Sequence, residues 1–227
     1  MAATARSSAT PTASGSSSTG VRRRARAAPP TRPALRERYD RRRREVIATA
    51  ARLFARRGYR ETSMGDLTEA TGLAAGGLYH YIESKDELLI SICDELLDPL
   101  LERAREIVAA GAPPAAQLRE LLHAWLEHIA THRDHMLVFA QERHVLEREP
   151  QWRRVRARRR EFEELLDGVL ARGEREGAWH FEDRAFTLLS LLGMVNYTPQ
   201  WLSPRGRLTP AQIADGYCDL ILAAAST

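Results

Sequence analysis

Apolar residues recur along most of this chain at the spacing that places them on one face of an α-helix. Val46, Ile47, Ala50 and Phe54 stand at i, i+1, i+4 and i+8, which predicts an amphipathic helix. The same periodicity predicts further helices, over about 62–71, 74–82, 84–110, 118–129, 133–146, 151–175, 183–197 and 209–224. We find no persuasive strand pattern and no internal repeat. The pattern therefore predicts an all-α protein of about nine helices.

Two of these predicted helices have unusual sequences. Pro99 lies inside the helix over 84–110, where it should kink or break the helix because proline has no backbone amide to donate. The helix over 183–197 is almost continuously apolar, so we expect it to be buried on two sides.

The stretch from Thr62 to Lys85 reads as a short helix, a tight turn and a second short helix. Ser63 and Asp66 fit a capping box at the start of the first helix, and Gly72 is placed to end it in a left-handed conformation. Such a pair is typical of a helix-turn-helix that places its second helix in the DNA major groove. It is equally typical of a helical hairpin inside any all-α domain.

Residues 44–94 resemble the N-terminal domain of the TetR family of bacterial regulators. The resemblance rests on Leu53-Phe54-Ala55, Gly58-Tyr59, Thr62-Ser63, Gly76-x-Leu78-Tyr79 and Ser84-Lys85. It covers about a quarter of the chain, and the helical remainder is compatible with it. The resemblance implies a three-helix DNA-binding domain over 34–90 and a helical ligand-binding and dimerisation domain over 91–227.

The net charge of +4 is unevenly distributed. Residues 1–45 carry twelve Arg and three acidic residues, a balance of +9, whereas residues 46–227 carry 22 basic and 27 acidic residues, a balance of −5. A basic segment beside a helix-turn-helix is the electrostatic footprint expected for phosphate. Residues 1–33 contain too few apolar side chains to fold, so we expect a disordered basic tail. Whether that tail touches phosphate or stays in solvent is left open.

The predicted second helix of the pair is poor in polar groups for reading bases. The family often has polar residues at the positions of Ala74, Ala75 and Gly77, which leaves Tyr79 and His80 for base contacts and Ala75 for a thymine methyl. The arginines before the first helix are implied to follow the DNA backbone or enter the minor groove. Our candidate DNA contacts are Arg41, Arg42, Arg43, Arg44, Thr62, Ser63, Ala75, Gly76, Gly77, Tyr79, His80 and Lys85.

The resemblance also implies an effector pocket among the later helices. Its candidate lining residues are Trp125, His128, Phe139, Glu142, Phe162, Met194, Asn196, Tyr197 and Trp201, with His144 as a further polar candidate. Each aromatic residue among them is also compatible with plain core packing.

The end of the chain resembles one branch of the family, through Trp201-Leu202-Ser203-Pro204, Gly206, Leu208-Thr209-Pro210 and Tyr217. Several members of that branch respond to acyl-CoA thioesters, so the resemblance implies a small hydrophobic or acyl-CoA effector. The arginine run over 153–160 either meets the CoA phosphates or forms a solvated face. The helices over 183–197 and 209–224 are implied to pair with their copies in a two-fold homodimer on a near-palindromic operator.

Other classes of function find less support in the sequence. The chain has no P-loop, G-x-S-x-G or H-E-x-x-H motif, so we expect neither an enzyme nor a cofactor. His128, His132 and His135 stand at i, i+4 and i+7, which leaves a metal-sensing regulator as an alternative. A helical interaction protein that has lost specific DNA binding is another.

The sequence also bears on where the protein acts. No run approaches the roughly 18 apolar residues of a membrane span, and the first twenty residues lack the apolar core of a secretory signal. We expect a cytoplasmic protein, although the Arg- and Ser-rich start also suits an organelle transit peptide. Cys93 and Cys218 lie in apolar helical surroundings and are expected to be buried thiols in a reducing compartment.

Overall fold

The computed structural model describes residues 29–142, 150–203 and 205–225. Within these ranges the chain forms nine α-helices and one short 3-10 helix, with no strand, so the all-α prediction is confirmed. The elements are α1 (Pro33–Arg57), α2 (Met64–Thr71), α3 (Ala75–Tyr81), α4 (Lys85–Ala109), α5 (Pro114–Thr131), α6 (Arg133–Gln141), η1 (Pro150–Trp152), α8 (Arg153–Arg175), α9 (Arg184–Trp201) and α10 (Pro210–Ala223).

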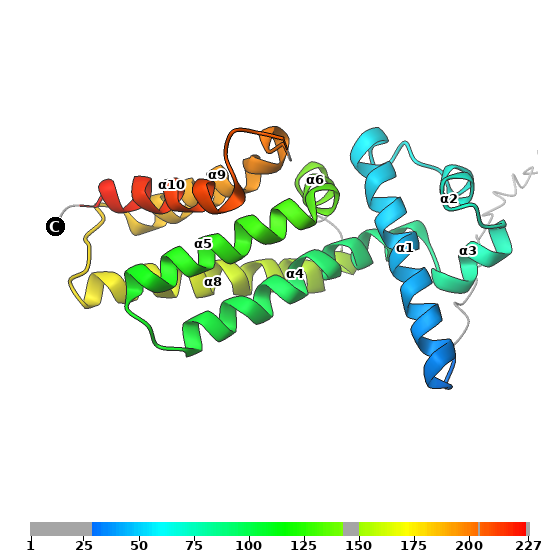
Figure 1. Cartoon of the computed structure of the whole chain (residues 1–227), viewed down its shortest axis with the longest axis horizontal. Helices are drawn as coiled ribbons and strands as arrows, with labels where there is room; N and C mark the ends of the chain where they lie inside the picture. Colours follow the sequence, from blue (N-terminus) through cyan, green and yellow to red (C-terminus); the bar gives the residue numbers. More distant parts are fainter. Residues whose placement is uncertain (1–28, 143–149, 204, 226–227) are drawn as a thin grey trace, which may run out of the picture.

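The helices form two lobes, and α4 runs from one into the other (Figure 1). Helices α1 to α3 pack around the start of α4, and their core includes Phe54, Leu67 and Leu88. The second lobe contains α5, α8, α9, α10 and the rest of α4, around a separate core that includes Trp125 and Leu166. Because the apolar stripe of α4 is buried in both lobes, this helix is their shared element.

Helix α4 continues through Pro99, so of the predicted kink or break the break is wrong, and a kink at this position stays a prediction. Pro99 is exposed, whereas Leu96, Leu97, Leu100 and Leu101 on either side of it are buried. A proline inside a helix costs about 3 kcal/mol. Each fully buried leucine contributes about 1.5–3 kcal/mol, so the burial around Pro99 outweighs the cost.

Helix α9 is buried on one side only. Leu191 and Val195 are fully buried, but Phe186 is 68%, Leu189 66% and Tyr197 66% exposed. The prediction that this segment is buried on two sides is therefore wrong for the single chain. On the neighbouring α10, Leu220 is 61% exposed, so both helices carry apolar side chains that the rest of the chain does not cover.

Local signals place the helix ends as expected. Ser63 and Asp66 form the capping box of α2, and Gly72 ends that helix at φ +66°. Cys93 and Cys218 are both buried free thiols, as expected, and burial raises the pKa of the Cys93 thiol. In the described ranges, no helix is both long enough and apolar enough to span a bilayer.

Candidate nucleic-acid interface and ligand pocket

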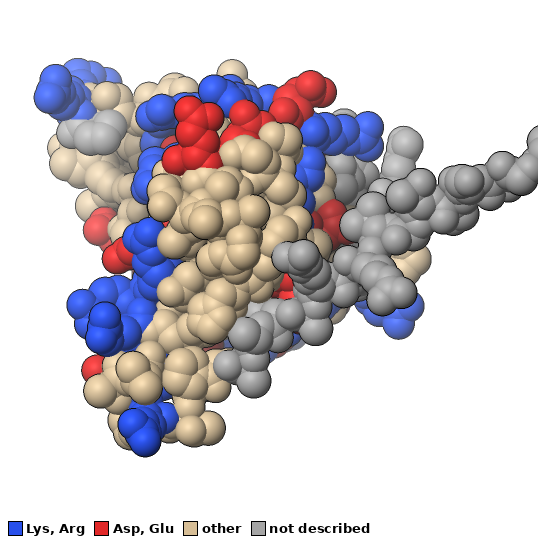
Figure 2. All heavy atoms as spheres, turned by 90° about the vertical axis from the view of Figure 1, so that its right-hand side faces the viewer, with Lys and Arg blue, Asp and Glu red and all other residues tan. Residues whose placement is uncertain are grey.

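Helix α3 presents its outer face at the end of the molecule. Leu78 is buried beneath it, Ala75, Gly76 and His80 are exposed, and Gly77 and Tyr79 are half-buried. Figure 2 looks onto this end, where a central surface without charged groups is bordered on the left and below by Lys and Arg atoms and above by both basic and acidic groups. Small side chains on an exposed helix allow another surface to approach its backbone closely.

The start of α1 is fastened to the end of α3 by Tyr39. This side chain is buried, its hydroxyl donates to the His80 carbonyl (3.2 Å), and its ring lies edge-on to the His80 ring at 5.4 Å. Beside this contact lies a hollow of about 460 Å³ whose basic lining residues are Arg38, Arg41 and Arg42. The first turns of α1 thus belong to the same surface as α3.

The four arginines from 41 to 44 have different surroundings. Arg41 and Arg44 are exposed. Arg42 donates to the Thr71 carbonyl (3.2 Å). Arg43 points inward, donates to the Ser91 hydroxyl (2.8 Å) and pairs with Glu87 (3.3 Å). Arg43 therefore fastens α1 to α4, while Arg41 and Arg44 are open to a polyanion.

Three predicted phosphate contacts take part in the turn between α1 and α2. Thr62 is buried, and its hydroxyl donates to the Gly58 carbonyl (2.8 Å). Ser63 is exposed and accepts from the Asp66 amide (3.1 Å). The Lys85 ammonium donates to the carbonyls of Tyr59 (2.9 Å), Arg60 (3.3 Å) and Thr62 (3.0 Å). A phosphate contact by Thr62 or Lys85 stays a prediction, and it would require these bonds to rearrange.

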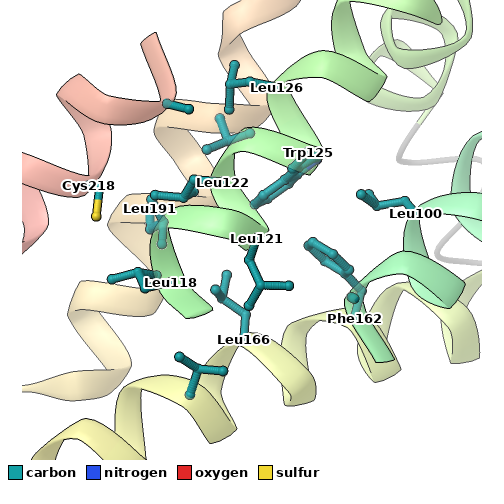
Figure 3. Packing of buried hydrophobic residues seen from close by; sticks show 14 of the residues in the cluster. Leu100, Leu118, Leu121, Leu122, Trp125, Leu126, Phe162, Leu166, Leu191 and Cys218 are labelled. Carbon is teal, nitrogen blue, oxygen red and sulfur yellow. The ribbon is translucent and has the colours of Figure 1, made fainter. Parts of the chain in front are cut away.

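A hollow of about 570 Å³ opens between α6, α8 and α9. It adjoins an inner cavity of about 30 Å³, and the two share six lining residues: Met136, Phe139, Arg159, Glu163, Leu192 and Asn196. The residues that line the inner cavity alone are all apolar: Leu96, Leu97, Leu100, Trp125 and Phe162. In Figure 3, Trp125 and Phe162 point toward each other from α5 and α8; their ring centroids are 4.8 Å apart.

Polar groups gather where the hollow opens. Gln141, Tyr197 and Gln200 line only the outer part, whereas Arg159 and Glu163, which form an ion pair (3.2 Å) along α8, line both the hollow and the inner cavity. This gradient, from apolar inside to polar outside, suits an amphipathic small molecule.

The structure brings together five of the nine predicted ligand residues: Trp125, Phe139, Phe162, Asn196 and Tyr197. Met194 packs against the core, and Trp201 is partly exposed and does not line the hollow. Glu142 lies at the joint between the lobes, where its carboxylate accepts from the Tyr59 amide (3.0 Å). His144 lies outside the described residues.

Glu163 was missed in the sequence, and Arg159 was named there only as one member of the arginine run over 153–160. Val155, Phe162 and Leu166 are buried on the inner face of α8, at steps that also place Arg159 on that face. Helical spacing was therefore the signal that distinguishes Arg159 from its neighbours in the arginine run. Arg154 and Arg158, by contrast, pair with Asp94 and Asp98 on α4.

The histidines at the α5–α6 boundary make backbone and ring contacts. The His128 Nε2 donates to the Leu96 carbonyl (2.7 Å), and the His132 Nδ1 donates to the His128 carbonyl (3.1 Å). Burial and the neighbouring His132 lower the pKa of His128 to about 4. Across the described residues, no three or more His, Cys, Asp or Glu side chains converge as metal ligands. The metal-sensing alternative is not favoured.

Two family models match the chain. "Bacterial regulatory proteins, tetR family" matches residues 46–92, which include α2 and α3. "Tetracyclin repressor-like, C-terminal domain" matches residues 111–225, which include the hollow's helices α6, α8 and α9.

Individual proteins agree with these matches. The HTH-type transcriptional repressor KstR2 of Rhodococcus jostii is 32% identical over 184 residues, which cover 80% of this chain and 89% of the relative. The structure of KstR2 of Mycobacterium tuberculosis superposes with a TM-score of 0.76 at 28% identity, over 82% of this chain and 95% of that one. AibR in complex with isovaleryl coenzyme A and operator DNA superposes with a TM-score of 0.71 at 28% identity, over 82% of this chain and 100% of that one.

Proposed function

This chain belongs to the TetR family of bacterial transcriptional regulators, and from that premise we propose that it is a repressor released from its operator by a small effector. The observation that carries the proposal is that α4 joins an outward-facing α3 to a lobe with an amphipathic hollow. A regulator that responds to a ligand without catalysing a reaction needs a surface that binds DNA, a site that binds the ligand and an element that connects the two. We propose that it acts in the cytoplasm, where it meets DNA.

We propose that the protein binds DNA as a homodimer, with α3 of each copy in the major groove. Two such helices read half-sites about 34–36 Å apart. Arg41 and Arg44 contact phosphates, and His80 and Ala75 face the bases. Because α3 offers few polar side chains, much of the sequence preference comes from DNA shape.

We propose an acyl-CoA or a similar amphipathic molecule as the effector. AibR, one of the structures this chain resembles, was solved with isovaleryl coenzyme A. The apolar residues of the inner cavity suit an acyl group, and Arg159, which lines both the cavity and the hollow, suits an anionic or thioester-bearing group. Of the run over 153–160, Arg159 is the residue that lines the hollow, whereas Arg154 and Arg158 pair with acidic residues of α4, so we assign this contact to Arg159.

The test is a titration of the DNA upstream of the protein's own and neighbouring genes, followed by fluorescence anisotropy with and without acyl-CoAs of several chain lengths. We expect salt-sensitive binding that one chain-length class weakens at least tenfold. Arg159→Ala should abolish the response, whereas Arg153→Ala, an exposed position on the same helix that does not line the hollow, should retain it.

The outcomes separate the parts of the proposal. Tight DNA binding that no acyl-CoA alters would contradict the proposed effector class, but it would still support the role of the protein as a DNA-binding regulator. Failure to bind any of these DNA segments specifically would contradict the repressor.

A further inference from the structure

We propose that Tyr39 is a positioning residue for DNA recognition, which holds the end of α3 and the His80 ring in the orientation that reads bases. This role rests on the proposed function, because it takes α3 as the helix in the major groove and His80 as a base contact. It deepens that function by making sequence preference depend on a side chain of α1 that is buried and so does not itself meet the DNA.

Helix α3 depends on other elements for its orientation. It has only seven residues, two of which are Gly76 and Gly77, and its N-cap residue Ala74 makes no side-chain hydrogen bond. A helix this short is not stable alone in water, and glycine weakens it further. Leu78 is buried beneath the helix, but it stands two residues before His80 and therefore on the opposite side. The burial of Leu78 does not orient the exposed His80 ring.

Tyr39 holds His80 through both its hydroxyl and its ring. His80 is the last residue but one of α3, so its carbonyl has no amide donor within the helix. The Tyr39 hydroxyl donates to this carbonyl (3.2 Å). The centroid of the Tyr39 ring lies 5.4 Å from that of His80 and 5.1 Å from that of Tyr81, and the His80 and Tyr81 rings are edge-on to each other at 5.1 Å. Three rings in mutual contact restrict the rotamers of His80.

The burial of Tyr39 serves α3 more than the core of the lobe. The core cluster that includes Phe54 and Leu67 does not include Tyr39, although this side chain is only 5% exposed. Among the described residues, the rings that pack against Tyr39 are those of His80 and Tyr81. A side chain that supports a binding residue in this way sets how precisely that residue meets its ligand.

The same tyrosine connects the helix that reads bases to the arginines that meet phosphate. Arg38 and Arg41 stand on either side of it in the sequence and are exposed. The hollow of about 460 Å³ is lined by these two arginines and also by Tyr39, His80 and Tyr81. A phosphate held there fixes the start of α1 and, through Tyr39, the direction of His80. The arginines contribute affinity for any sequence, whereas Tyr39 affects which sequence is preferred.

The experiment measures base discrimination before and after loss of the Tyr39 hydroxyl. The full-length protein first selects a preferred site from random duplexes, and fluorescence anisotropy then gives the dissociation constant for every single base-pair variant of that site. His80→Ala identifies the positions that His80 reads. At those positions we expect Tyr39→Phe, which keeps the ring, to reduce discrimination at least about threefold. Its affinity for non-specific duplex should stay within about twofold of the wild-type value.

A double-mutant cycle and a matched control separate positioning from a general loss of stability. In the His80→Ala background, Tyr39→Phe should change discrimination no further, because its effect passes through His80. The control is Tyr217→Phe in the other lobe, where the hydroxyl likewise donates to a helix carbonyl, that of Met194 (3.3 Å). This variant should show a comparable loss of stability in urea and keep the full discrimination.

The outcomes distinguish the role of Tyr39 from the proposed function. A Tyr39→Phe variant that weakens all sites equally, changes none of them, or lowers discrimination further in the absence of His80 would overturn the inference. If His80→Ala altered no position, the inference would also be overturned, but a selected site that outcompetes its variants would still support the regulator. If the protein selected no site at all, the proposed function would fail together with the inference.

Discussion

Lys85 joins the first turn of α4 to the loop between α1 and α2. Its ammonium group uses three hydrogen bonds on backbone carbonyls and lies 4.5 Å from the centre of the Tyr59 ring. We predict that Lys85→Ala lowers the free energy of unfolding by about 1–3 kcal/mol, because the carbonyls lose their donor and the ring its cation. Urea unfolding measures the change.

The matched control for this prediction is His80→Ala. His80 is exposed but its ring lies edge-on to those of Tyr39 and Tyr81, so its removal should lower stability by no more than about 0.5–1.5 kcal/mol and alter the preference among DNA sites. If Lys85→Ala instead left stability intact and weakened every DNA site equally, phosphate contact would be the main role of the lysine.

His128 gives the protein a pH dependence whose sign follows from its surroundings. Burial, and then His132, lower its pKa from 6.5 to about 4, so the folded chain keeps it neutral where the unfolded chain binds a proton. Its contribution to stability is therefore present above pH 6.5 and is lost as the pH falls toward 4.

We predict that the free energy of unfolding decreases between pH 6.5 and pH 4, and that His128→Gln makes this decrease shallower. Glutamine keeps a side-chain N–H for the Leu96 carbonyl but does not titrate. Unfolding followed by circular dichroism across this pH range checks the slope. An equal slope in both proteins would assign the decrease to other groups.

At the scale of elements, a glycine in α8 leaves room for a side chain of the loop that follows this helix. A Cβ at Gly173 would lie 2.0 Å from the Trp179 ring, whose indole N–H donates to the Leu170 carbonyl (2.9 Å). We predict that Gly173→Ala destabilises the protein by at least about 1–3 kcal/mol through overpacking.

The same helix provides the control. Gly168 is exposed, and a Cβ there would meet nothing within 4 Å, so Gly168→Ala should stabilise the helix by up to about 1 kcal/mol. Thermal unfolding of the two variants should shift in opposite directions. Shifts of the same sign would contradict the contact with Trp179.

The elements also show which features periodicity can predict. The spacing of Val46, Ile47, Ala50 and Phe54 and the capping box at Ser63 act within a few residues, so helices and their ends could be read from the sequence. Periodicity could not predict that α4 continues through Pro99, because the buried leucines that outweigh the cost of the proline belong to the cores of two lobes. Nor could it predict the exposed face of α9, because hydrophobicity alone does not say whether the covering surface belongs to the same chain.

The same distinction between local and long-range determinants applies to the residues of the two candidate sites. The outward face of α3 followed from local spacing, and so did the aromatic residues that reach the hollow. The inward turn of Arg43 depends on Glu87 and Ser91, and the position of Glu142 depends on Tyr59. These partners are more than forty residues away in sequence, where a local pattern carries no information.

At the scale of the whole molecule, α6 contacts both the hollow and the DNA-binding lobe. Phe139 and Gln141 line the hollow, while the next residue, Glu142, accepts from the Tyr59 amide. Tyr59 in turn packs edge-on against Phe54, with a centroid separation of 5.3 Å. A shift of α6 caused by an effector would therefore reach the loop before α2.

We predict that Glu142→Ala reduces the factor by which effector weakens DNA binding, with each ligand still bound when offered alone. Coupling between sites is a free energy of its own, typically 1–3 kcal/mol, and can be lost separately from affinity. Anisotropy titrations with both ligands measure it, and Glu127→Ala on the exposed face of α5 is the control. Unchanged coupling would show that α4 carries the signal without α6.

Lys85 is also the one lysine among the 34 basic residues of the chain. A protease that cuts only after lysine therefore has a single peptide bond to attack, between Lys85 and Asp86 in the first turn of α4. That bond is accessible only when the turn unfolds locally, so the rate of cleavage in native buffer reports how often the start of α4 opens. The cut separates residues 1–85, which include α1 to α3, from residues 86–227, and operator DNA should slow it by the factor with which it stabilises the closed turn.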